Sequence, residues 1–158
     1  MVAKQAATGI EPVLSAVRRC LAARPEIDFA YLFGSLARGD AHGSSDVDVA
    51  VYVADEPPVE TFGGYRASLL SDLLACVGRN DVDLVLLKSA PVMLRHRVLR
   101  DGQLFLCRNE ILRVQFADRT LRQYFDTAPL RRLAQEYQLR SIERGTFGRA
   151  VAFKRVSG

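Results

Sequence analysis

The sequence predicts an α/β (α+β) fold, in which a small mixed β-sheet carries helices packed mainly on one face. Short apolar runs of strand length alternate with longer segments whose apolar residues recur every three or four positions. Hydrophobic residues make up 49% of the 158 residues and charged residues 25%, which is typical of a globular domain with a buried core. We expect a single domain over residues 1–140, followed by a basic C-terminal tail over residues 141–158 that is ordered only with a partner.

The chain opens with a helix, a strand and a short helical turn. Over residues 10–23, apolar residues share one helical face: Ile10, Val13, Leu14, Val17 and Leu21. Pro25 ends this helix. The run FAYLF at 29–33 predicts a buried strand, because it is short, apolar and rich in aromatic residues. The strand stops at Gly34-Ser35, and residues 36–38 fit one or two helical turns.

Two further strands combine alternating apolar residues with aspartates. Residues 46–53 read DVDVAVYV, so the four valines face one side of the strand and both aspartates face the other. Residues 81–87 read DVDLVLL and repeat this arrangement. Between them, a leucine-rich segment predicts a helix over residues 62–77 that ends at Gly78. Each of the two strands therefore presents a pair of carboxylates on one face.

The second half of the chain is mostly helical. Pro91 suits the first turn of a helix that runs to about Arg100. A short apolar run at 103–107 predicts an edge strand. Residues 110–137 then follow a helical pattern, which Pro129 breaks or kinks.

The sequence does not fit membrane, disulfide-rich or zinc-binding proteins. No apolar run is long enough to span a bilayer, and the N-terminal segment lacks the apolar stretch of a signal peptide, so we expect a cytoplasmic protein without membrane contact. The three cysteines, Cys20, Cys76 and Cys107, lie far apart and form no Cys-x-x-Cys motif. The two histidines have no partner at the spacing that zinc ligands need.

Charge is distributed unevenly along the chain, although the net charge is only +4. Residues 1–87 contain 7 Lys/Arg and 12 Asp/Glu, whereas residues 88–158 contain 15 Lys/Arg and 6 Asp/Glu. One interpretation is a solvated basic face on the helices, and the other is a surface for an acidic partner, a nucleotide or RNA. The aromatic residues of this half fit a helical core better than RNA stacking, so direct nucleic-acid binding is not expected.

The chemistry is indicated by a Gly-Ser dipeptide that ends a strand and, ten residues later, an Asp-x-Asp pair within the next strand. Gly34 lets the backbone approach a phosphate, and Ser35 adds a hydroxyl and an N–H at the start of a helical turn. Asp46 and Asp48 project from the same face of their strand. Their carboxylates can bind Mg²⁺ or Mn²⁺ together with substrate phosphates. Asp-x-Asp alone is a common surface pattern, but the complete arrangement is much more specific.

Three further residues complete the candidate site. Such a site needs a third carboxylate, for which Asp83 is the first choice and Asp81 the competing one. Arg38 can reach nucleotide phosphates or can be a solvated arginine that caps a turn. Ser45 can donate to a phosphate or form the turn before the second strand.

These residues resemble the minimal nucleotidyltransferases (MNT) of the polymerase-beta-like superfamily. The resemblance lies in Leu32-Phe33-Gly34-Ser35, Ala37-Arg38-Gly39, Ser45-Asp46-Val47-Asp48 and Val82-Asp83-Leu84-Val85. It implies a nucleotidyltransferase fold, ATP as substrate and two Mg²⁺ ions, with Mn²⁺ as a substitute. It also implies that Asp46, Asp48 and Asp83 are catalytic metal ligands and that Gly34 and Ser35 bind the nucleotide.

The segment 119–126, RTLRQYFD, looks like the C-terminal helix of bacterial minimal nucleotidyltransferases that act as antitoxins. Their partner is a HEPN-domain ribonuclease toxin, usually encoded alongside. The resemblance implies that this protein transfers AMP from ATP to a tyrosine of that toxin and silences it. Two alternatives remain. One is an aminoglycoside-like, small-molecule nucleotidyltransferase, for which the chain looks too short to hold a second domain. The other is a non-catalytic antitoxin that acts by complex formation.

Overall fold

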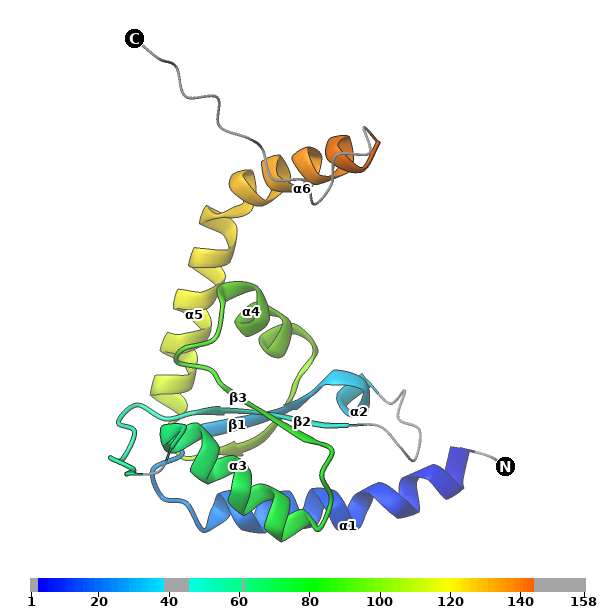
Figure 1. Ribbon diagram of the computed structural model, residues 1–158. Coiled ribbons are helices and arrows are strands. Elements are labelled where there is room, and N and C mark those ends of the chain that lie inside the picture. Colours follow the sequence, from blue (N-terminus) through cyan, green and yellow to red (C-terminus); the bar gives the residue numbers. More distant parts are fainter. Residues whose placement is uncertain (1–2, 39–45, 61, 144–158) are drawn as a thin grey trace. The chain divides into compact units, whose positions relative to one another are not determined.

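The computed structural model of the protein describes residues 3–38, 46–60 and 62–143 (Figure 1). The chain divides into two compact units, residues 1–121 and residues 122–158. The described residues form, in order, α1 (Ala3–Ala22), β1 (Phe29–Phe33), α2 (Gly34–Arg38), β2 (Val47–Tyr52), α3 (Gly64–Val77), β3 (Val82–Leu86), α4 (Val92–Asp101), β4 (Gln103–Cys107), α5 (Glu110–Asp126) and α6 (Ala128–Glu143). No helix among them is long and apolar enough to cross a membrane.

The first unit contains one four-stranded sheet with the strand order β3-β2-β1-β4. Strand β1 pairs antiparallel with β2 and with β4, whereas β2 and β3 are parallel. The sheet is therefore mixed, and the predicted α/β class is confirmed. The run at 103–107 forms an edge strand, as its pattern predicted.

One face of the sheet is covered by α1 and α3, which lie side by side (Figure 1). The valines of β2 point into this layer, because alternate residues of a strand face the same side. They pack against fully buried side chains of the two helices, Val17, Leu21, Leu69 and Leu73. Helix α3 ends at Gly78, whose N–H donates to the Leu74 carbonyl oxygen over 2.9 Å, so the predicted stop is confirmed.

The opposite face is covered by α4 and by the first part of α5. The rings of Phe29 and Tyr52 stack there with centroids 4.7 Å apart, and both contact Phe116 of α5. Val98 of α4 is fully buried in the same cluster. Helices thus lie on both faces of the sheet, whereas the sequence led us to expect most of them on one face. The physical reason is that β1 is buried on both sides, so each side needs a cover.

Some helix boundaries differ from the predicted ones. Helix α1 begins at Ala3 instead of residue 10 and accommodates Pro12 within it. Helix α3 begins at Gly64 instead of residue 62. The difference at α1 arises because apolar periodicity marks only the part of a helix that faces the core. Helix α3 begins later because Gly63, the residue before it, has a left-handed conformation. Of the predicted basic tail, residues 141–143 belong to α6, and residues 144–158 lie outside the described residues.

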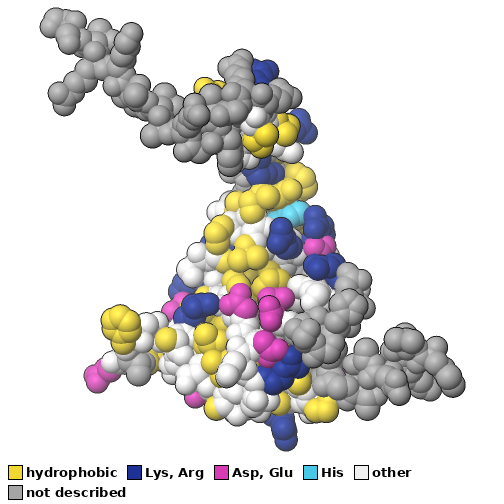
Figure 2. All heavy atoms as spheres, turned by 45° about the vertical axis from the view of Figure 1, so that its right-hand side comes forward, with side chains coloured by type: hydrophobic (Ala, Val, Ile, Leu, Met, Phe, Trp, Pro, Cys, Tyr) yellow, Lys and Arg dark blue, Asp and Glu magenta, His cyan; other side chains and the backbone are white. Residues whose placement is uncertain are grey.

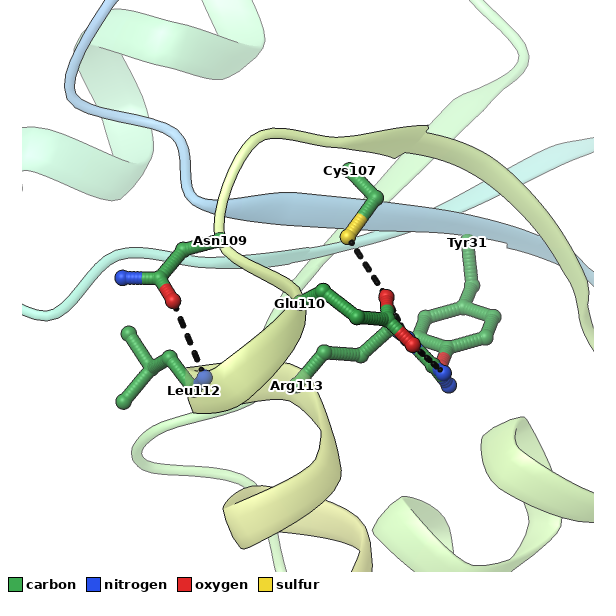
Figure 3. Close-up of polar contacts among 6 residues, drawn as sticks. All are labelled: Tyr31, Cys107, Asn109, Glu110, Leu112 and Arg113. Atoms are coloured by element: carbon green, nitrogen blue, oxygen red, sulfur yellow. Dashed lines mark hydrogen bonds and ion pairs between the residues drawn. The ribbon is translucent and has the colours of Figure 1, made fainter.

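The start of α5 is tied to the sheet by polar contacts (Figure 3). The Leu112 N–H donates to Oδ1 of Asn109 over 3.0 Å, which caps the first turn. Arg113 donates from Nε to Oε2 of Glu110 over 2.8 Å and from Nη1 to the Tyr31 hydroxyl over 3.3 Å. Because Tyr31 belongs to β1, these contacts fix the helix where it leaves the strand layer.

The second unit contains the end of α5 and all of α6. The two helices are separated at Thr127, whose hydroxyl donates to the Gln123 carbonyl oxygen over 2.8 Å. The break therefore precedes Pro129, which was expected to cause it. Pro129 lies in the first turn of α6, where its missing N–H has no helical acceptor to lose. The Arg131 guanidinium lies over the Tyr124 ring at 3.8 Å from its centroid and joins the two helices.

Candidate active site

The Gly-Ser turn lies directly against the second aspartate of the Asp-x-Asp pair. Strand β1 ends at Phe33 and α2 begins with the next residue, so Gly34 makes the turn with a φ of 75°. A Cβ atom on Gly34 would come within 1.8 Å of Oδ2 of Asp48. Only glycine tolerates both this backbone conformation and this contact. Ser35 follows as the second residue of α2 and is half-buried.

The strand register aligns the acidic residues across the sheet. Asp48 is the partner of Phe33 on β1 and of Asp83 on β3. Residues paired in this way project from the same face of a sheet, so Asp48 and Asp83 are neighbours. Asp46 lies two residues before Asp48, just ahead of β2. The register therefore brings carboxylates from two strands to the end of β1, where the chain turns.

Electrostatics confirm that these acids interact. Burial raises the pKa of Asp48 above its ordinary value, and the negative charges of Asp83 and Asp46 raise it further. The positive charge of Arg38, at the end of α2, acts in the opposite direction. Carboxylates that repel one another in this way attract cations. Figure 2 turns the end of the sheet that carries α2 toward the viewer and shows acidic side chains gathered there, with basic ones close by.

The two candidates for the third acid have different partners. Asp81 is held by Arg79, which donates from Nε over 2.8 Å and from Nη2, and hydrogen bonding to Arg79 lowers the pKa of Asp81. Asp83 has a looser contact, with Nη2 of Arg66 at 3.4 Å. Asp83 also acts on Asp48 through its charge, whereas Asp81 is neutralised by its own arginine. The geometry therefore favours Asp83 as the acid that works together with Asp48.

The donor set fits a divalent cation of the Mg²⁺ type, because its carboxylate oxygens are hard ligands. Within the part of the chain that the structure describes, no three acidic, histidine or cysteine side chains are close enough to hold a metal ion together. A cation at Asp48 would therefore take further oxygens from water or substrate phosphates, as Mg²⁺ commonly does. Ser45, the remaining nucleotide-binding candidate, lies outside the described residues.

Two residues beside the site were not found from the sequence. Gln103 of β4 donates from Nε2 to the Ala37 carbonyl oxygen over 2.8 Å and so supports α2. Arg66 of α3 contacts Asp83, as described above. Both lie far from their partners along the chain, and neither belongs to a recognisable motif. Only the folded arrangement reveals them.

A family model described as polymerase beta, nucleotidyltransferase matches residues 16–111, which include all the candidate site residues. A protein named protein adenylyltransferase MntA from Shewanella oneidensis is 38% identical over 79 residues, which cover 50% of this chain and 53% of the relative. The chain therefore spans about half the length of this curated relative.

Solved structures show the same relationship. A chain in a crystal structure of a toxin–antitoxin with AMP-PNP is 28% identical, with a TM-score of 0.66, and the match covers 78% of this chain and 95% of that chain. A complex of tri-AMPylated Shewanella oneidensis HEPN toxin with MNT antitoxin contains a chain that is 26% identical, with a TM-score of 0.61, over 78% of this chain and 93% of that chain. These matches confirm the resemblance seen in the sequence, and the chain belongs to the polymerase beta nucleotidyltransferase family.

Proposed function

We propose that this protein is a metal-dependent nucleotidyltransferase antitoxin that transfers AMP from ATP to a tyrosine of a cognate HEPN ribonuclease toxin. The observation that carries the proposal is the contact between the Gly34 turn and Asp48, with Asp83 aligned beside Asp48. This arrangement places a phosphate-binding turn against a cluster of negative charge. The relatives named above, which include an adenylyltransferase and toxin–antitoxin complexes, support the choice of nucleotide and partner.

The proposed reaction is an in-line attack on ATP. The tyrosine oxygen attacks the α-phosphorus, the bond from this phosphorus to the bridging oxygen breaks, and pyrophosphate leaves. Gly34 and Ser35 hold the triphosphate through the turn and the first N–H groups of α2. Arg38 and Ser45 assist in binding the nucleotide. Asp83 orients the acceptor hydroxyl, so catalysis depends on positioning and on balancing charge.

Asp46, Asp48 and Asp83 are the residues that would hold Mg²⁺ or Mn²⁺, each ion through one or two of these carboxylates and through water or phosphate oxygens. When bound, such ions neutralise charge on the triphosphate and favour ionisation of the attacking hydroxyl. The pKa of Asp48 is raised first by burial and then by the negative charges of Asp83 and Asp46, and this negative charge favours binding of a cation.

Inhibition by complex formation alone is a second candidate, favoured by the surface of α6. Its exposed large apolar side chains are Leu130, Leu133, Tyr137, Leu139 and Ile142. Apolar side chains in such number on one helix are typical of surfaces that bind another protein. A protein can both bind its toxin stably and modify it. The two candidates are therefore distinguished by whether AMP is transferred to the toxin.

The test is to incubate the purified protein with ATP, Mg²⁺ and the HEPN toxin encoded beside it, and to measure the mass of the toxin. We expect one or more added AMP units, located on tyrosine by peptide mass spectrometry, and no addition when EDTA replaces Mg²⁺. AMP on a kanamycin-like acceptor instead would indicate the small-molecule activity. An unmodified toxin that is nevertheless inhibited would leave complex formation as the function.

A further inference from the structure

The first turn of α3 places an arginine on the outer edge of the sheet. Arg66 donates from Nε to the Leu84 carbonyl oxygen over 3.0 Å. Leu84 belongs to β3, an outermost strand of the sheet, so this contact anchors the guanidinium along the strand edge. The helix begins at Gly64, directly after Gly63, and both glycines have a positive φ.

The anchored guanidinium also contacts Asp83, which together with Asp46 and Asp48 forms what we call the acid cluster. Nη2 of Arg66 lies 3.4 Å from Oδ1 of Asp83, and the two side chains are 51% and 61% exposed. Asp83 is the partner of Asp48 in the register of β2 and β3. Arg66 therefore brings a positive charge to the same carboxylate that the proposed function assigns to a divalent cation.

We propose that Arg66 is the resident counter-cation of the acid cluster. It neutralises Asp83 while no divalent cation is bound, and it competes with that cation for the Asp83 carboxylate. This inference rests on the proposed roles of Asp48 and Asp83. It adds a residue that sets how much Mg²⁺ the enzyme needs.

The contact between Arg66 and Asp83 is one that a divalent cation can replace. Arg66 is held to the backbone by Nε, so Nη2 can release Asp83 without loss of the anchor at Leu84. The contact to Asp83 is long, single and exposed, and such contacts are weak. Arg79 differs, because both Nε and Nη2 of Arg79 contact Asp81. Asp81 and Asp83 thus each contact an arginine, but only Asp83 is the register partner of Asp48.

The competition is tested by binding of Mn²⁺ without ATP, measured from the electron paramagnetic resonance signal of free Mn²⁺. In Arg66→Gln the affinity for Mn²⁺ should rise about two- to fivefold, because a positive charge near the site is lost. Arg66→Lys keeps the charge and should bind Mn²⁺ as the wild type does. Arg24→Gln is the matched control, because Arg24 pairs with Glu26 and Asp72, and it should also leave the affinity unchanged.

Unchanged or weaker Mn²⁺ binding by Arg66→Gln would overturn the inference, as would an equal gain in Arg24→Gln. Thermal unfolding of each variant shows whether the fold is intact. Asp48→Asn separates the inference from the proposed function. If it abolishes Mn²⁺ binding, the proposed site stands and Arg66→Gln decides the inference alone. If the wild type binds no Mn²⁺, the inference requires Arg66→Gln to gain binding, and its failure to do so would overturn it.

Activity provides a second readout that a purely structural role would not reproduce. The Mg²⁺ concentration for half-maximal AMP transfer should fall about two- to fivefold in Arg66→Gln, in line with its tighter cation binding. The rate at saturating Mg²⁺ should stay within about twofold of the wild type, because the competition is then absent. A lower saturating rate with an unchanged Mg²⁺ requirement would contradict competition at Asp83.

Discussion

At the scale of single residues, the glycine of the Gly-Ser pair is required for two separate reasons. Its backbone has a φ of 75°, which other residues adopt at a cost, and its missing Cβ leaves room for the Asp48 carboxylate. Gly78 has only the first requirement, because its φ is 68° and a Cβ there would meet nothing within 4 Å. The two glycines therefore form a matched pair.

Gly34→Ala and Gly78→Ala are expected to lower the free energy of unfolding by a similar amount, about 1–2 kcal/mol, because both force alanine into a left-handed conformation. Only Gly34→Ala also displaces the Asp48 carboxylate, so only this variant should lose AMP transfer, by about tenfold or more. Denaturant unfolding and a transfer assay on both variants test this. Equal activity of the two variants would show that the contact with Asp48 is unimportant.

Asp48→Asn is expected to stabilise the cation-free protein, with a thermal midpoint about 1–3 °C higher at neutral pH. The pKa of Asp48 is raised in the folded state, so ionisation is less favourable there than in the unfolded chain, where the pKa is near 3.8. The penalty is full above the raised pKa and disappears as the pH falls through that pKa and below 3.8. The midpoints of wild type and variant, measured in EDTA, should therefore converge toward low pH. A destabilised variant at neutral pH would contradict the repulsion inferred here.

The residue pattern predicted part of the site. Strict alternation on β2 and β3 placed two aspartates of each strand on one face, since side chains alternate along a strand. It could not decide between Asp81 and Asp83, because the arginine that contacts Asp83 comes from α3, 17 residues away along the chain. Contacts between segments that are distant in sequence follow from the tertiary fold and carry no local signal.

At the scale of elements, α2 is too short to be stable alone, since isolated helices need about 12 residues or more. It has five residues and none of them is buried. The hydrogen bond from Gln103 to the Ala37 carbonyl oxygen therefore has a large part in placing the helix that follows the Gly-Ser turn.

Gln103→Leu removes that hydrogen bond and is expected to raise the KM for ATP about three- to tenfold, the effect of one neutral hydrogen bond. The thermal midpoint should change little, because Gln103 is exposed and belongs to an edge strand. Gln115→Leu on the exposed side of α5 is the matched control. Steady-state kinetics with varied ATP measure both. An unchanged KM in Gln103→Leu would show that α2 is held by other contacts.

Elements with a strong local pattern were predicted well, and those that depend on their surroundings were not. The limits of β1 agree with the run FAYLF, because a run of five consecutive apolar residues is stable only when it is buried. The same run already indicated burial on both sides, from which helices on both faces follow. The break at Thr127 could not be predicted, because Pro129 is compatible with the first turn of a helix.

At the scale of the whole molecule, the candidate site and most of the exposed large apolar side chains lie in different parts of the sequence. All described candidate site residues belong to the first unit. Among the described residues, nine of the twelve exposed large hydrophobic side chains belong to α5 and α6. The basic second half of the chain includes these helices. A surface that is both apolar and basic suits a protein partner better than solvent alone.

The central claim is that the acids beside the Gly-Ser turn catalyse AMP transfer to the toxin. The most direct measurement compares wild type and Asp48→Asn for the rate of AMP addition to the toxin, followed by mass spectrometry, with co-purification of the toxin as the control for binding. We expect the variant to react about 100-fold more slowly or not at all, because Asp48 would hold the cation that neutralises charge on the triphosphate. The variant should still co-purify with the toxin as the wild type does. A variant that modifies the toxin at the wild-type rate would contradict the account.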